Sequence, residues 1–238
     1  GGNGAAEVSV LLAGVRGEVY AQPYREHERG GDVHYLSVCG KTMLTKIIVA
    51  DVAGHGADAA LVSRLIHGGL RDHLDELDNS RLLLGLNRAA RTAGEETFRF
   101  TTMVSATLNS RDHELVYAYA GHPVILHGDA ETGRFRPIRP DDGERGGLPL
   151  GVLAGTDYVQ HRRRLRPKDV LLFYTDALIE VRDPSGEVLG EDGLARLCEE
   201  APDPRPAALK AHLLARLRAR AGGGGFEDDL TLVLLEVL

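Results

Sequence analysis

Apolar and polar residues alternate in several short runs near the start of the chain, and this period of two predicts β-strands. Strands are expected over residues 17–24 and 33–39. A Gly40-Lys41 turn then leads into an apolar strand that ends at Asp51. These segments together predict a meander of sheet at the beginning of the fold.

The period changes from two to that of a helix after Asp51. Apolar and small residues from Ala57 onward fall on one helical face, and a second helix is expected from about Ser80, a candidate N-cap. A last helix is marked by leucines at 209, 213 and 217, and glycines 222–225 end it. The helices therefore come in groups that interrupt the strands.

The remaining segments return to strand patterns. Residues 101–109 and 114–120 predict a hairpin, continued by residues 124–127, with a weaker strand over 134–138. Residues 140–151 read as a loop, and strands are expected over 158–164, 170–174 and 230–238. Residues 1–16 are expected to be a flexible N-terminus or an expression remnant, and residues 17–238 one domain. Strands flanked by helix pairs, without βαβ alternation, favour an antiparallel α+β layered fold.

Composition narrows the classes of function. The net charge of −7 argues against a nucleic-acid-binding surface, which would be basic. Two distant cysteines, Cys39 and Cys198, give neither a disulfide framework nor a zinc motif, so a reducing, cytoplasmic compartment is expected. No apolar run reaches the length of a transmembrane helix, so no membrane contact by this segment is expected.

Four acids stand beside strands in similar settings: Asp32 after Gly30-Gly31, Asp51, Asp176, and the pair Asp228-Asp229 before the last strand. Carboxylates of this kind suit hard divalent cations such as Mg²⁺ and Mn²⁺. Two such ions can activate a water for attack on phosphate. Each acid alone is explained about as well by a helix cap, a turn or a surface charge, but all four together predict one shared site.

Six motifs in order resemble the bacterial PP2C-type (PPM) serine/threonine phosphatases, in their SpoIIE/RsbU-like branch. They are Gly30-Gly31-Asp32, Asp51-Val52-Ala53-Gly54-His55-Gly56, Ala120-Gly121-His122-Pro123, Leu148-Pro149-Leu150-Gly151, Tyr174-Thr175-Asp176 with Glu180, and Asp228-Asp229-Leu230-Thr231. The resemblance runs from about Gly17 to the C-terminus. It implies an αββα sandwich, two antiparallel sheets with helices outside.

The resemblance also implies a centre of two Mn²⁺ or Mg²⁺ ions. By matching motif, Asp32 and Asp51 would contact the metals, with Asp51 as the bridge, and Val52 would offer its backbone carbonyl. Asp176 and Asp228 would complete the second metal's shell, with Asp229 as the substitute for Asp228.

Two departures from the family pattern bear on activity. The branch has an acid where this chain has Tyr35, and it prefers glycine where this chain has Ala177. An alanine methyl restricts the backbone, so the geometry of the metal loop is in question.

Several histidines and arginines have competing interpretations. His55 is a candidate general acid, since a pKa near neutrality suits that role, although a packing role is the commoner one. His122 and His34 are expected to be structural. The run 161–164 could dock an acidic phosphoprotein through its arginines, and a solvated strand face is the simpler account. Gly30-Gly31-Asp32 also occurs in diguanylate cyclases, but the flanking residues do not match.

The leading hypothesis is metal-dependent hydrolysis of phosphoserine or phosphothreonine on a protein by a metal-activated water. Resemblance suggests a phosphorylated STAS-type anti-sigma-factor antagonist (an anti-anti-sigma factor) as the partner, and a homodimer is left open. A catalytically weak regulatory or scaffolding domain of the same fold is the alternative, and a small-molecule phosphohydrolase is the third reading.

Overall fold

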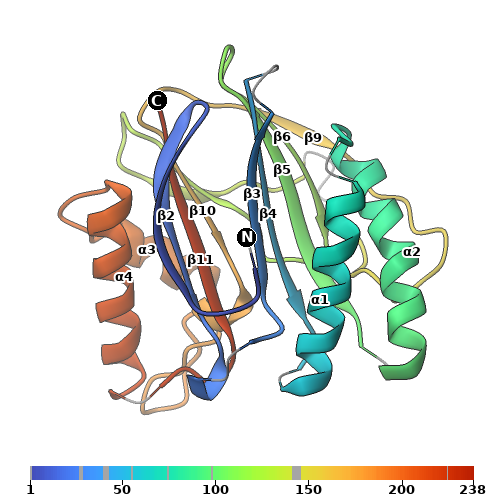
Figure 1. The fold of residues 1–238 in the computed structure, drawn as a ribbon. Coiled ribbons are helices and arrows are strands. Elements are labelled where there is room, and N and C mark those ends of the chain that lie inside the picture. The colour runs from blue at the N-terminus through green and yellow to red at the C-terminus, as the bar shows by residue number, and fades with distance from the viewer. Residues whose placement is uncertain are drawn as a thin grey trace.

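Strands that bury both faces form two antiparallel sheets that stack on each other. In the computed structural model, which describes residues 2–26, 29–39, 43–54, 56–73, 75–97, 99–140, 146–223 and 225–238, the first sheet has the order β3-β4-β5-β6-β9 and the second the order β1-β2-β11-β10-β7-β8. Figure 1 shows the two sheets side by side between two groups of helices. The expected αββα sandwich is confirmed.

The first sheet is built by strands from the middle of the chain. Its members are β3 (Val33–Cys39), β4 (Leu44–Val52), β5 (Thr101–Asn109), β6 (Glu114–Ala120) and β9 (His161–Arg164). Helices α1 (Ala57–Asp72) and α2 (Asn79–Thr97) cover its outer face, as Figure 1 shows. The predicted hairpin of residues 101–120 is therefore the centre of this sheet.

The second sheet joins the two ends of the chain. It contains β1 (Ala6–Leu12), β2 (Val15–Gln22), β7 (Leu126–Gly128), β8 (Phe135–Pro137), β10 (Val170–Tyr174) and β11 (Leu230–Val237). Helices α3 (Gly190–Glu199) and α4 (Pro206–Arg220) lie outside it, and the short 3₁₀ helices η1 (Tyr24–Glu26) and η2 (Asp176–Leu178) follow β2 and β10. The last strand, β11, lies between β2 and β10.

The alternation of side chains along β4 shows how the layers are sealed. Ile47 and Val49 are fully buried between the two sheets, whereas Ile48 and Ala50 point the other way, into the cluster under α1 and α2. Successive side chains of a strand face opposite sides, so an uninterrupted apolar run can fill two cores at once. A third apolar cluster lies between the second sheet and helices α3 and α4.

Four local expectations are corrected. Residues 6–12, expected within a flexible N-terminus, form β1, which pairs with β2 along its whole length. The expected opening meander is confirmed for β3 and β4, which pair, but is wrong for β2, which pairs with β11 in the other sheet. Helix α3 was not expected, although Leu194, Leu197 and Cys198 fall at helical spacing. The strand expected over 158–164 is shorter in the structure, where β9 spans His161–Arg164.

The cap of α2 also differs from the expectation. Asp78, rather than Ser80, is the capping residue. Its Oδ1 accepts hydrogen bonds from the Ser80 backbone N–H (2.9 Å), the Ser80 hydroxyl (2.6 Å) and the Arg81 N–H (3.2 Å). A carboxylate can satisfy several of the free N–H groups at a helix start, which the single hydroxyl of Ser80 cannot.

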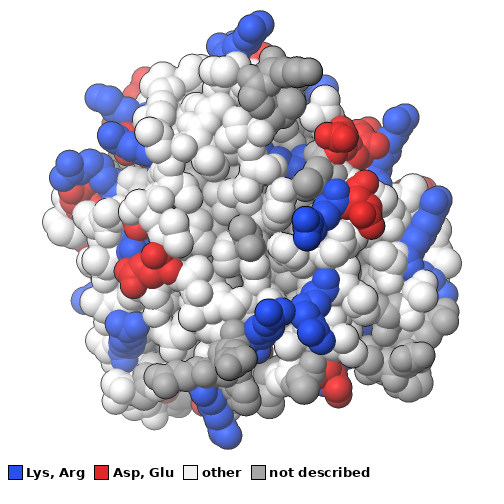
Figure 2. Space-filling view, viewed as in Figure 1, with Lys and Arg blue, Asp and Glu red and all other residues white. Residues whose placement is uncertain are grey.

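The charges on the face viewed in Figure 1 are mixed. Figure 2 shows lysine, arginine and acidic side chains interspersed on this face, with no large patch of one sign. Among the described residues, none of the helices combines the length and the apolar character that crossing a membrane requires.

Candidate active site

The four predicted acids stand at one end of the sandwich because of the directions of their strands. Asp32 comes just before β3, and Asp51 lies near the end of β4, its antiparallel neighbour. In the other sheet Asp176 follows β10, and Asp228 comes just before β11. The start of one antiparallel strand lies beside the end of the next, so each sheet contributes a pair of acids to this end.

Thr175 joins the two pairs. Its hydroxyl donates a hydrogen bond to Oδ2 of Asp32 (2.9 Å) and accepts one from the backbone N–H of Thr231 (3.0 Å). Thr175 is fully buried. A residue of the second sheet thus fixes the orientation of an acid that belongs to the first, and the sequence pattern gave no signal of this role.

Asp229 has a different role from that of a surface charge. Its Oδ1 accepts the backbone N–H of Tyr24 and its Oδ2 accepts that of Gly31, both at 2.6 Å, and the residue is 4% exposed. A Cβ on Gly30 would lie 2.5 Å from the Asp229 carboxyl carbon. Glycine at position 30 therefore allows a close approach, and Asp229 anchors the loop that carries Asp32.

The pKa values show that the acids converge. The pKa of Asp51 is raised well above its ordinary value, first by burial and then by the charges of Asp176 and Asp228. Burial and the charge of Asp51 likewise raise the pKa of Asp32. Like charges that interact at close range favour the protonated form of each other. The structure therefore brings Asp32, Asp51, Asp176 and Asp228 together into one acidic centre.

Glu180 belongs to the same centre, although the predicted site residues did not include it. The pKa of Asp176 is raised to about 6, first by burial, then by Glu180 and Asp228. Glu180 also raises the pKa of Asp51. Its spacing of four residues from Asp176 places it one helical turn further on, and this spacing was the available sequence signal.

Among the described residues, three of the four acids form no ion pair with a positive side chain. Asp32, Asp51 and Asp176 take part in none of the ion pairs there. Arg99, which contacts the turn after Asp51, donates a hydrogen bond to the carbonyl of Ala53 and lies 3.8 Å from Asp58 instead. Buried charge without a partner is unfavourable, so these carboxylates need protons or cations.

The donor set fits a hard divalent cation. One oxygen of Asp32, Oδ1, is buried and has no hydrogen-bond partner. Among the described residues, no group of three or more His, Cys, Asp and Glu side chains is already arranged to hold an ion. Mg²⁺ commonly uses one or two carboxylates and fills its remaining positions with water and phosphate oxygens, so an open arrangement of acids is compatible with it.

The turn after Asp51 is only partly described. The backbone carbonyl oxygen of Val52 would lie 3.0 Å from a Cβ on Gly31, so the β4 end and the glycine loop touch. His55, the candidate general acid, lies outside the described residues. The predicted role of the Val52 carbonyl stays a prediction.

The two departures from the family pattern leave the acidic centre intact. Ala177 lies in η2 and is absent from the residues with positive φ, so its methyl causes no backbone strain there. Tyr35 packs against the first helix, with its ring 6.2 Å from that of His67. Side chains alternate along β3, so an acid at position 35 would face α1 and not Asp32.

Two histidines brace the neighbourhood. His122 is buried, and its Nδ1 lies 2.8 Å from the hydroxyl of Thr102, which pairs with Asp51 in the sheet. Burial lowers the pKa of His122 to about 3 and that of His34 to about 4. Both rings are therefore neutral at physiological pH, and their expected structural roles stay a prediction.

The basic run of β9 forms an exposed strand face. Arg162, Arg163 and Arg164 are exposed, and Arg162 pairs with Glu114 at 2.8 Å on the neighbouring strand. A cavity of about 310 Å³ opens instead beside Asp228, lined by residues that include Glu180 and Arg182. Another cavity, of about 410 Å³, lies at the start of α4, and none of the four acids lines it.

Comparison with known proteins gives a consistent picture. Residues 42–238 match the family model described as Stage II sporulation protein E (SpoIIE). The chain is 32% identical over 191 residues to the phosphoserine phosphatase RsbU of Bacillus subtilis (strain 168), covering 79% of this chain and 54% of RsbU. The chain thus spans about half the length of this relative.

Solved structures share the fold. The crystal structure of the RsbU and RsbW domains of Rv1364c from Mycobacterium tuberculosis superposes with a TM-score of 0.80 and 26% identity, covering 98% of this chain and 62% of that one. The PP2C phosphatase domain of SpoIIE from Bacillus subtilis, solved with a fragment of its regulatory domain, gives a TM-score of 0.76 at 15% identity, covering 99% of this chain and 64% of that one.

Proposed function

Because the chain belongs to the SpoIIE family of PP2C-type phosphatases, we propose that it hydrolyses phosphoserine or phosphothreonine on a regulatory protein in a metal-dependent reaction. The observation that carries the proposal is the convergence of buried carboxylates from both sheets. The name of the relative RsbU, a phosphoserine phosphatase, supports the choice of phosphoserine.

The proposed site uses each acid in a separate way. Asp32 and Asp51 would hold the metals together with the Val52 carbonyl, and Asp176 and Asp228 would complete the ligand set. Asp229, whose two oxygens already accept backbone N–H groups, would stay the anchor of the glycine loop. Mn²⁺ or Mg²⁺, when bound, would lower the pKa of a water and offset the charge of the phosphate.

The residues of the chain would then do three things. The carboxylates position the cations, because strand ends hold them with little freedom. The cavity beside Asp228 would admit the polypeptide next to the phosphorylated residue. His55 would donate a proton to the leaving serine or threonine oxygen, if its ring reaches that atom.

The test compares phosphate release by the wild-type chain and by Asp51→Ala on a phosphoprotein with Mn²⁺. Removal of this acid should lower kcat at least 100-fold, on the order of an essential catalytic group. Asp203→Ala is the matched control, since Asp203 is a surface acid that pairs with Arg205, and its activity should be unchanged. Equal rates for wild type and Asp51→Ala would end the proposal.

The competing reading is a regulatory or scaffolding domain with little activity. This hypothesis rests on the two departures from the family pattern, at Tyr35 and Ala177. Neither residue changes the acidic centre. Calorimetric titration with Mn²⁺ separates the two readings, because the enzyme must bind metal and an adaptor need not.

A phosphorylated STAS-domain anti-anti-sigma factor is the proposed substrate. Its rate of dephosphorylation should exceed that of a small aryl phosphate, which a small-molecule phosphohydrolase would prefer. A homodimer is tested by light scattering.

A further inference from the structure

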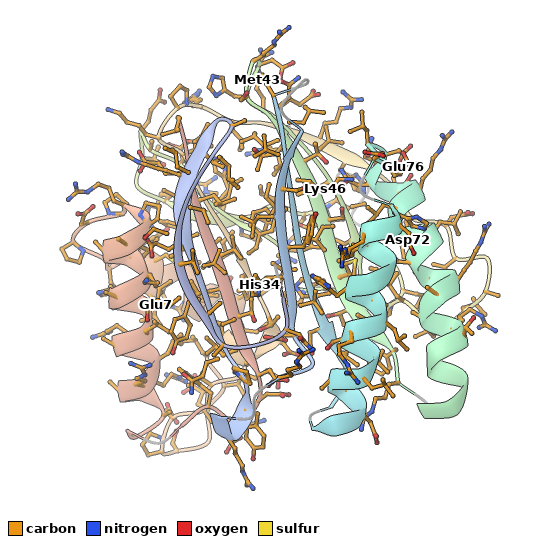
Figure 3. The ribbon with its side chains drawn as sticks, in the orientation of Figure 1. Glu7, His34, Met43, Lys46, Asp72 and Glu76 are labelled. Carbon is orange, nitrogen blue, oxygen red and sulfur yellow. The ribbon has the colours of Figure 1, made fainter. Side chains whose placement is uncertain are left out.

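The segment that precedes β1 crosses from one sheet to the other. Gly2 pairs with His34 of β3 through two backbone hydrogen bonds, of 2.9 and 3.1 Å. Four residues later the chain enters β1, at the edge of the second sheet. Figure 1 places the N-terminus between the two sheets, and Figure 3 labels His34 in the same region.

Asn3 makes three hydrogen bonds, two to the glycine loop and one to helix α1. The backbone carbonyl of Asn3 accepts the N–H of Gly30 (2.8 Å), and the Asn3 side-chain amide donates to the carbonyl of Gly30 (3.3 Å) and to the hydroxyl of Ser63 (2.7 Å). Both backbone groups of Gly30 are thereby satisfied by one residue. Gly30 lies two positions before Asp32, so the contact bears directly on the loop that delivers this acid.

Ser63 makes the contact a link between two parts of the centre. Ser63 is fully buried on α1, the helix that begins after the turn following Asp51. Its hydroxyl accepts the Asn3 amide and lies 3.1 Å from both the Gly30 and the Ala60 carbonyl, to one of which it can donate at a time. The Asn3 amide therefore ties the loop before Asp32 to the helix after Asp51.

Asp229 holds the same loop at the next residue, through the N–H of Gly31. Asn3, Asp32 and Asp229 also line one small cavity of about 10 Å³. A loop that is hydrogen-bonded at two consecutive residues keeps the acid that follows it in one orientation better than a loop bonded at one.

We propose that Asn3 is a positioning residue of the acidic centre: its side-chain amide fixes the Gly30-Gly31 loop against α1, so that Asp32 is held in the orientation that binds the metal. Asn3 lies outside residues 42–238, the span that matches the family model, so family membership does not assign it this role. The inference rests on the proposed metal-dependent activity.

The experiment measures Mn²⁺ binding by calorimetry, without substrate, for the full chain and for Asn3→Ala. Removing a residue that orients a metal ligand commonly weakens metal affinity by about 10- to 100-fold, and about tenfold weaker binding is expected here. The control is Ser9→Ala. This variant removes one side-chain hydrogen bond, from Ser9 of β1 to Glu18 of β2, and this bond involves none of the four acids. The Mn²⁺ affinity of this variant should equal that of wild type.

A double-mutant cycle with Ser63→Ala distinguishes positioning from a general loss of folding. If the amide acts through Ser63, the double variant should lose less Mn²⁺-binding free energy than the sum of the losses in the two single variants. Thermal melting of each variant reports the folded fraction separately. Unchanged Mn²⁺ affinity in folded Asn3→Ala, with wild type binding normally, would overturn the inference alone. Absence of Mn²⁺ binding by wild type would instead overturn the proposed function.

Discussion

Thr175 donates its hydroxyl hydrogen to Oδ2 of Asp32 across 2.9 Å, and this bond joins the two sheets where the acids meet. Thr175→Val keeps the shape of the side chain and removes the donor. We expect weaker Mn²⁺ binding by about tenfold, because a ligand loses the partner that orients it, and a lower rate at limiting metal. Calorimetry and phosphate release at several Mn²⁺ concentrations measure both.

The control for this variant is Thr45→Val. Thr45 is also fully buried, and its hydroxyl makes one hydrogen bond, of 2.7 Å, to the carbonyl of Ala13 near the other end of β4. Thr45→Val should lose about 1 kcal/mol of stability, and Thr175→Val about 1–3 kcal/mol, because it also leaves the buried N–H of Thr231 without its acceptor. Thr45→Val should nevertheless bind Mn²⁺ like wild type. An equal loss of Mn²⁺ affinity in both would contradict the specific role of Thr175.

Asp229 should contribute to stability more than an ordinary acid next to a metal site. Asp229→Ala leaves the N–H groups of Tyr24 and Gly31 without their acceptors in a buried place. Losing partners for buried donors costs about 1–3 kcal/mol each, so we expect the free energy of unfolding in urea to fall by about 2–4 kcal/mol without metal. A loss below about 0.5 kcal/mol would show that water replaces the carboxylate.

Ala177 should be neutral although the family prefers glycine there. The residue has no positive φ, so Ala177→Gly relieves no strain and only adds freedom to the unfolded chain. We expect a loss of about 0.5–1 kcal/mol in the free energy of unfolding and an unchanged Mn²⁺ affinity. A clear gain in Mn²⁺ affinity or in kcat would mean that the methyl restricts the loop during catalysis.

The metal-free protein should lose stability as the pH rises. The pKa of Asp176 is raised to about 6 in the folded state, from an ordinary value near 4. The folded state then binds more protons than the unfolded state between these values, so the free energy of unfolding decreases as the pH increases through that range. A shift of about two pKa units corresponds to about 3 kcal/mol.

Unfolding in urea at about pH 4.5 and about pH 7.5 measures this dependence. Asp176→Asn carries no charge, so its stability should fall less over the same range. Mn²⁺ should raise the stability of wild type most at the higher pH, because a cation replaces the missing protons. A metal-free protein that is more stable at pH 7.5 than at pH 4.5 would contradict the expected sign.

The sequence predicted the structure best where its pattern of residue types allowed a single interpretation. The run from Lys46 to Asp51 predicts a buried strand ending on an acid, and β4 confirms it. The four acids could be grouped from their strand-end positions alone, and the structure brings them together. By contrast, α3 spans only ten residues, so a helical period extends over few turns there, and the pairing of β2 with β11 joins segments about 200 residues apart.

Residues that support the centre were harder to find from sequence. Thr175 and Asp229 act through hydrogen bonds to segments about 140 and 200 residues away, and no periodicity records such partners. Asn3 lies in the stretch that the sequence predicts to be flexible. Short polar residues and glycines predict a loop whatever hydrogen bonds that loop makes in the fold. Long-range contacts of single polar atoms are visible only in the folded chain.

The position of β11 sets the smallest fragment that is worth expressing. Strand β11 is buried at all eight positions and lies between β2 and β10. A fragment trimmed to residues 42–238 would lose β2 and Asp32, leaving an apolar strand with one bare edge. Such edges pair with other chains, so this fragment should precipitate, whereas a boundary placed before Gly2 keeps both the sheet and the acid.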